Sequence, residues 1–264
     1  HEPGQTREAT TELRAGQIHG ADAVSTWQAK ASVSGPVSDT VSLGISGSYF
    51  DQDALFENPF TGEDFNDMSR YSVRGQLVAQ PTDAFKLRLI LAHAETLDSM
   101  GSGEGDFFYG TVPAALNNAF GRACPDNDPT NRVVCRNYAG EGTLTADEAT
   151  LIATYRFAND YELTSLTSWD EYEMTKPLDA DQLSIHVADF NDRQAGEAIQ
   201  QELRIASPAD QSLSWIAGAF YYQSDFERGN YPGKDTFVLG TEAPFIPLAP
   251  GVPAGQPGNA GSLL

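Results

Sequence analysis

Residues 71–79 read Tyr-Ser-Val-Arg-Gly-Gln-Leu-Val-Ala, and this stretch decides the fold. Its odd-numbered residues are apolar or small, whereas Ser72, Arg74 and Gln76 place polar groups between them. Successive side chains of a β-strand point to opposite faces, so the alternation predicts a strand with one apolar and one polar face.

The same alternation recurs along most of the chain. Candidate strands cover 7–18, 24–35, 39–50, 69–80, 84–96, 148–158, 161–173, 196–206 and 212–224. Most of them reach the roughly 9–11 residues that a tilted strand needs to cross a bilayer. The chain is therefore predicted to be all-β.

Two kinds of connection join these segments. Tight turns with Pro or Asp are predicted at 35–39, 80–83, 158–160 and 207–210. Long polar segments are predicted at 51–68, 97–147, 174–195 and from 225 onward. Short turns on one rim and long loops on the other are typical of an antiparallel transmembrane β-barrel, with residues 97–147 as its longest extracellular loop.

Composition narrows the function classes. No stretch of the 264 residues approaches the roughly 18 apolar residues of a spanning helix, which excludes a helical membrane protein. The formal net charge of -21 argues against nucleic acid as a partner, because that ligand requires clustered Lys and Arg. A mean hydropathy of -0.36 does not distinguish a barrel from a soluble protein, since a barrel alternates its faces.

Aromatic residues lie mainly toward the ends of the predicted strands. They are Tyr49, Tyr71, Phe85, Tyr155, Phe157, Tyr161, Trp169, Trp215 and Tyr221. Amphipathic rings settle at the depth of lipid headgroups, although any single ring could equally be a core residue. Only the set as a whole indicates two aromatic girdles.

Several stretches resemble the barrel strands of TonB-dependent outer-membrane receptors. They are VSGPVSDT at 33–40, GSYFDQD at 47–53, NPFTG at 58–62, QQELRIASP at 200–208 and WIAGAFYYQ at 215–223. The resemblance implies a plugged barrel in the outer membrane of a Gram-negative bacterium. It also implies import of a scarce nutrient, such as a ferric siderophore, cobalamin or a glycan, with energy from the TonB protein.

Plugged transporters of this kind have about 22 strands, so about nine strands would form part of a barrel. The chain opens at His1 and ends after a segment rich in Pro and Gly, and we expect it to be an internal piece of a longer protein. The plug and the TonB-binding segment would then lie outside it. A passive porin or adhesin-type barrel and a soluble all-β binding module remain as alternatives.

A few residues are candidates for roles in such a receptor, from their place in the strands or from the aromatic and cationic side chains of the longest loop. Polar-side arginines would face the lumen and its plug; they are Arg74, Arg88, Arg156 and Arg204. Candidates for ligand contact lie in the longest loop; they are Phe107, Phe108, Tyr109 and Arg122. A small molecule or metal chelate, the membrane lipid and TonB are the expected partners.

The two cysteines, Cys124 and Cys135, lie close together in the longest predicted loop. In an exported loop such a pair favours a disulfide, and a metal site would lack further ligands nearby in the sequence. Apart from this pair, the sequence contains no recognisable catalytic constellation, metal motif or cofactor motif, so no enzyme activity is expected.

Residues 51–68 carry several Asp and Glu residues and no Lys or Arg. The simpler interpretation is a solvated loop, which acidic side chains keep in water. The alternative is that acidic loops concentrate cationic ligands at the barrel mouth, in which case ligand capture should fall steeply with added salt.

Overall fold

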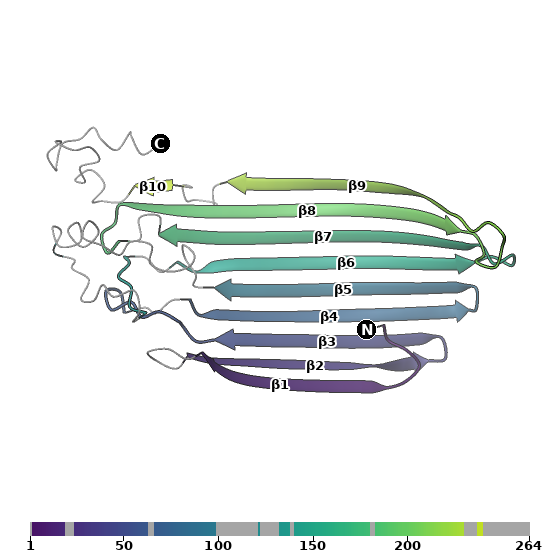
Figure 1. The fold of residues 1–264 in the computed structure, drawn as a ribbon, viewed down its shortest axis with the longest axis horizontal. Coiled ribbons are helices and arrows are strands. Elements are labelled where there is room, and N and C mark those ends of the chain that lie inside the picture. The colour runs from purple at the N-terminus through teal and green to yellow at the C-terminus, as the bar shows by residue number, and fades with distance from the viewer. Residues whose placement is uncertain are drawn as a thin grey trace.

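The computed structural model describes residues 2–18, 24–62, 66–98, 121, 132–137, 140–179, 183–229 and 237–239. The fold is all-β, as the alternation predicted, and the strands lie side by side in chain order (Figure 1). Within the described residues no helix is long and apolar enough to span a membrane.

One antiparallel sheet contains all the strands. They are β1 (Glu8–Ile18), β2 (Val24–Ser38), β3 (Val41–Gln52), β4 (Met68–Thr82), β5 (Phe85–Asp98), β6 (Gly142–Arg156), β7 (Glu162–Asp179), β8 (Ala188–Ala206), β9 (Ile216–Gly229) and β10 (Phe237–Leu239). Each of β1 to β8 pairs with the next strand along the chain, and β10 pairs with β8 beyond the end of β9. The nine long strands match the nine predicted segments.

The tight turns lie where turn residues occur in the sequence. Two are shorter than the predicted 35–39 and 80–83, and two are longer than the predicted 158–160 and 207–210, since 157–161 joins β6 to β7 and 207–215 joins β8 to β9. The turn between β2 and β3 is Asp39-Thr40, and that between β4 and β5 is Asp83-Ala84. Pro36 and Pro81 lie in the strands, at positions where the register shifts. A proline has no amide to donate to the ladder, so an irregular position accommodates it. All these turns lie at one end of the sheet, the turn end (Figure 1).

At the opposite end of the sheet, which we name the loop end, the predicted boundaries of the long loops are wrong. Strand β5 extends to Asp98 and β6 begins at Gly142, so the connection is shorter than the predicted 97–147. The predicted loop 174–195 shrinks to 180–187, because β7 and β8 continue through most of it. These extensions mix polar and apolar residues on their faces, so they lack the alternation that revealed the rest of each strand.

Cross-strand partners share a face of a sheet, which sorts the side chains into two sets. One row of partners across the sheet consists of Thr10, Ser32, Ser46, Arg74, Ala92, Glu148, Asp170, Ala198 and Ser224. All have even numbers, so we name the even-numbered residues of β1–β9 the polar face and the odd-numbered residues the apolar face.

The apolar face is covered by large side chains that remain open to solvent. Leu43, Leu77, Leu89 and Leu151 form one row of direct partners across β3 to β6. Ile45 is 62% exposed and Leu151 is 41% exposed. Monomeric soluble proteins rarely expose a contiguous apolar surface of this kind, which marks it as a surface for another apolar phase.

Strand β9 departs from this division. Phe220, Tyr222 and Phe226 lie on its polar face and are 62%, 55% and 60% exposed, respectively. The rings of Phe220 and Tyr222 stack with centroids 6.5 Å apart. Strand β9 therefore carries large exposed aromatic rings on its polar face, which the alternation of 212–224 did not predict.

Candidate functional site

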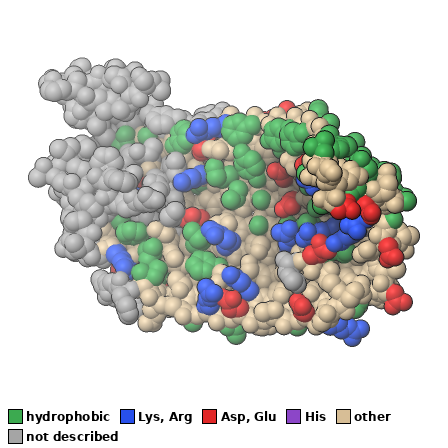
Figure 2. Space-filling view, turned by 45° about the vertical axis from the view of Figure 1, so that its right-hand side comes forward, with side chains coloured by type: hydrophobic (Ala, Val, Ile, Leu, Met, Phe, Trp, Pro, Cys, Tyr) green, Lys and Arg blue, Asp and Glu red, His purple; other side chains and the backbone are tan. Residues whose placement is uncertain are grey.

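The two faces differ sharply in charge. Every Lys and Arg of strands β1–β9 lies on the polar face except Arg193. In Figure 2 basic side chains are interspersed with acidic ones on the visible face of the sheet. The cations of the strands are therefore concentrated on the polar face, whereas carboxylates lie on both faces.

The four predicted arginines all lie on the polar face, but their surroundings differ. Arg156 pairs with Glu162 at 3.5 Å, and Arg204 pairs with Glu202 at 3.6 Å. Arg88 donates to Gln76 Oε1 at 2.7 Å. Among the described residues Arg74 has neither a hydrogen bond nor an ion pair, so its exposed guanidinium is available to another partner.

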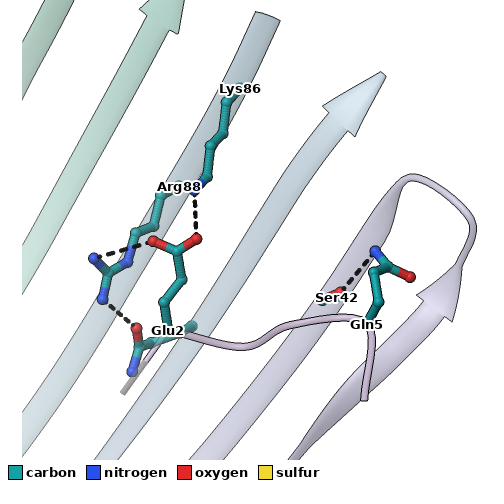
Figure 3. A network of polar contacts seen from close by, with 6 residues as sticks. Glu2, Gln5, Ser42, Lys86 and Arg88 are labelled. Atoms are coloured by element: carbon teal, nitrogen blue, oxygen red, sulfur yellow. Dashed lines mark hydrogen bonds and ion pairs between the residues drawn. The ribbon is translucent and has the colours of Figure 1, made fainter. Parts of the chain in front are cut away.

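The segment before β1 folds back across the polar face. Its Glu2 carboxylate lies between Lys86 and Arg88 of β5, 2.5 Å from the ammonium and 3.7 Å from the guanidinium (Figure 3). Gln5 donates to the Ser42 hydroxyl at 3.4 Å. Pro3 is buried against Gly44, and a Cβ atom added at position 44 would lie 3.3 Å from Pro3 Cγ. Residues 2–7 thus form a strap that nothing in the alternation pattern predicted.

A hollow of about 580 Å³ opens in the polar face over β4 to β8. Arg74 lines it on one side and Glu148, Asp170 and Tyr172 on the other. Gly196 of β8 lies beside the ring of Tyr172. A Cβ atom added at position 196 would approach Tyr172 Cε1 to 2.5 Å, so any larger residue there would displace the ring. Arg74 could be recognised from the sequence, whereas Glu148 and Asp170 could not, because only the register places them in the same row as Arg74.

Two aromatic belts cross the apolar face. The loop-end belt is Trp27, Tyr49, Tyr71, Trp169 and Tyr221, and the turn-end belt is Phe85, Tyr155, Phe157, Tyr161 and Trp215. Eight positions separate Tyr161 from Trp169, which corresponds to roughly 27 Å along a strand. At a strand tilt of about 35–45° this length corresponds to a height of roughly 20 Å, somewhat below the height of about 25 Å expected for the apolar band of a transmembrane barrel.

Polar tips in the loop-end belt bond to carboxylates. Trp27 Nε1 donates to Asp51 at 3.1 Å, and Trp169 Nε1 donates to Glu197 at 2.8 Å. The Tyr71 hydroxyl donates to Glu95 at 3.1 Å. An amphipathic ring with its polar tip toward water is the arrangement that a membrane interface favours.

Three connections pack together at the loop end and form what we name the loop cap: residues 57–58, 132–137 and 183–187. The amide of Val134 donates to the Glu57 carbonyl at 2.9 Å, and that of Asn137 donates to the Leu183 carbonyl at 3.0 Å. Val134 and Ile185 are 0% exposed, so the cap has its own small core. Buried Asn58 donates from Nδ2 to the Arg136 carbonyl at 3.0 Å.

Cys135 lies buried in the loop cap and is disulfide-bonded. Its predicted partner Cys124 lies outside the described residues, as do the ligand-contact candidates Phe107, Phe108, Tyr109 and Arg122. Within the described residues no group of three His, Cys, Asp or Glu side chains is placed to hold a metal ion.

Strands β8 and β9 continue past the loop-end belt, where Arg228 binds Asp192. The guanidinium donates to both carboxylate oxygens, at 2.9 and 3.1 Å, and Gln194 donates to the same carboxylate at 2.9 Å. The hydrogen bonds from Arg228 hold the pKa of Asp192 below its ordinary value of 3.8, although burial opposes the shift.

We predict that Arg228→Gln lowers the urea midpoint of unfolding in a pH-dependent way. A carboxylate with a depressed folded-state pKa stabilises the fold above its unfolded-state pKa, and this stabilisation is lost as the pH falls through the folded value. The difference from wild type should therefore be full at pH 7 and shrink below about pH 4. In an Asp192→Asn background Arg228→Gln should have no further effect; a pH-independent loss would contradict the assignment.

No protein-family model matches the chain, and no curated protein matches it. Among solved structures it is similar to the ferric yersiniabactin uptake receptor FyuA of Yersinia pestis, with a TM-score of 0.62 at 17% sequence identity. The match covers 86% of this chain and 32% of that receptor, so the chain spans about a third of it. That neighbour is a transport receptor and not an enzyme. The chain has the fold of part of the β-barrel of a TonB-dependent receptor.

Proposed function

We propose that this chain forms part of the barrel wall of a TonB-dependent receptor in the outer membrane of a Gram-negative bacterium. Its apolar face meets lipid, and its polar face lines the lumen, where Arg74, Arg88, Arg156 and Arg204 face a plug. The receptor imports a scarce nutrient, with a ferric siderophore as the leading class of cargo. TonB supplies the energy through a segment outside these residues.

The observation that carries the proposal is the combination of one exposed apolar face with a polar face that holds nearly all the strand cations. A soluble sheet has no reason to keep an apolar band between two aromatic belts, since both of its ends meet the same solvent. A passive porin would share this division. The likeness in fold to a ferric-siderophore uptake receptor favours active import over passive diffusion.

The first test is fractionation of cells that express the natural full-length protein. We expect it in the outer-membrane fraction, released by detergent but not by high salt or alkaline carbonate.

The second test is uptake of ⁵⁵Fe-labelled siderophores in otherwise identical strains with and without TonB. Uptake that needs both the protein and TonB supports the receptor, uptake without TonB indicates a porin, and release into detergent-free buffer indicates a soluble module.

A further inference from the structure

The strap of residues 2–7 is seated on one row of partners near the turn end of the polar face. Ser42 of β3, Val78 of β4 and Arg88 of β5 are successive partners in this row. Gln5 donates to Ser42 at one end of the row, and the Glu2 carboxylate contacts Arg88 at the other (Figure 3). The strap therefore crosses three strands within a few residues.

Between these two ends the strap fits closely on the sheet. Pro3 is buried, and a Cβ atom added at Gly44 would lie 3.3 Å from Pro3 Cγ and 3.5 Å from Pro3 Cβ. Ser42 is 2% exposed and Val78 is 8% exposed. These two side chains are closed off by residues of this chain, so their burial does not depend on what else fills the lumen.

The charged end of the strap, by contrast, remains within reach of water. The side chains of Glu2, Lys86 and Arg88 are 38%, 40% and 25% exposed, respectively. Ion pairs that are exposed to this degree are weak, and salt screens them. The strap precedes β1, which begins at Glu8, so its release breaks no hydrogen bond of the ladder.

The Glu2 contact is the stronger of the two polar anchors. Its single carboxylate faces two cations, and Arg88 is itself oriented by a hydrogen bond to Gln76 at 2.7 Å. The bond from Gln5 to Ser42 is long at 3.4 Å and joins two neutral groups, so it contributes less. Loss of the charge at Glu2 therefore favours release of the strap.

We propose that the strap is a releasable latch, held shut by the Glu2 carboxylate on Lys86 and Arg88. In the shut state it covers Ser42 and occupies both cations. In the open state the sheet stays intact, both cations are freed, and Ser42 and Gly44 become accessible. The latch goes beyond the proposed function and does not depend on it, because it needs only the sheet and the strap.

The test uses the natural full-length protein in detergent micelles, with Ser42→Cys as a reporter beneath the strap. Iodoacetamide carries no charge and reaches a covered thiol only when the strap opens, so the rate of alkylation measures the open fraction. Peptide mass spectrometry follows residue 42 alone. Val78→Cys, in the middle of the same row, is a second reporter in case the first variant does not fold.

The variants in this reporter background are Glu2→Gln and the double substitution Lys86→Gln with Arg88→Gln. The first removes the anion of the latch, and the second removes its cations. Lys30→Gln is the control, because Lys30 is a cation of the polar face that lies in another row, opposite Ser48.

We expect the reporter thiol to react at least about 100-fold more slowly in the folded protein than in the urea-unfolded protein. Glu2→Gln and the double variant should each accelerate alkylation at least about threefold, since an exposed ion pair changes an equilibrium by up to about fivefold. Their combination should react no faster than the double variant. Added salt should accelerate the parent but not Glu2→Gln.

Alkylation of the folded parent at the rate of the unfolded protein would show that the strap does not cover Ser42. Equal rates in the parent, Glu2→Gln and the double variant would show that the Glu2 contact does not hold the strap shut, and so would acceleration by Lys30→Gln to the same extent. Each of these results overturns the latch. Outer-membrane fractionation of the same proteins tests the proposed function separately, because a latch on this sheet opens in the same way wherever the sheet lies.

Discussion

Leu151→Arg should lower the free energy of unfolding in lipid vesicles by about 2–4 kcal/mol, the cost of placing an arginine at the lipid-facing midplane of a barrel. Leu151 lies on the apolar face midway between the aromatic belts and is 41% exposed. In a bilayer that exposure is to lipid, so the new charge loses its hydration. Urea titration of the full-length protein in vesicles measures the loss.

The matched control is Thr10→Arg, an arginine on the polar face. Thr10 lies between Glu8 and Glu12 on the same face of β1, so an added cation meets carboxylates and water there. We expect a change within about 0.5 kcal/mol. Equal losses for the two variants would show that the apolar face does not meet lipid, and a loss for Thr10→Arg alone would reverse the assignment of the faces.

Ile185→Ala should loosen the loop cap by about 2–5 kcal/mol, the usual cost of truncating a fully buried isoleucine. Ile185 is 0% exposed and shares the cap with Val134, which is equally buried. The amides of Val134 and Asn137 donate across the cap, so their hydrogen exchange reports its opening. At about 1.4 kcal/mol per tenfold, we expect their exchange to accelerate at least roughly 30-fold.

Leu213→Ala is the control for the cap, because Leu213 lies at the turn end and is 73% exposed. It should leave the exchange of both amides unchanged. Accelerated exchange in the strand interiors of Ile185→Ala, at the same rate as in the cap, would show that the cap does not open as a separate unit. Unchanged exchange at Val134 and Asn137 would show that Ile185 does not hold it together.

The strands could be predicted because the two faces of each strand meet different environments, one apolar and one polar. This difference leaves a period of two residues in the sequence. Where the apolar face lies between the belts, as in β4, the predicted 69–80 differs from Met68–Thr82 by one or two residues at each end. Beyond the loop-end belt the period disappears. Strand β8 begins at Ala188, eight residues before the predicted 196, because its pairing with β7 and side-chain bonds such as that between Arg228 and Asp192 extend it without an alternating pattern.

The candidate site was only partly predictable. The polar side of each strand identified Arg74, Arg88, Arg156 and Arg204, since a residue's face depends only on its position in the alternation. Which side chains meet across strands depends on register, and register depends on turn lengths and on long connections such as that between β5 and β6. The row that joins Arg74 to Glu148 spans such a connection, as does the contact of Glu2 with β5.

The sequence by itself determined that the chain is all-β, how many long strands it has, and which side chains share each face. These features follow from local alternation and turn chemistry, which act over a few residues. Only the tertiary structure decided how far the strands extend, how three connections form the loop cap, and which charges face one another across the hollow. Those features depend on pairing between segments far apart in the chain, which leaves no periodic signal in the sequence.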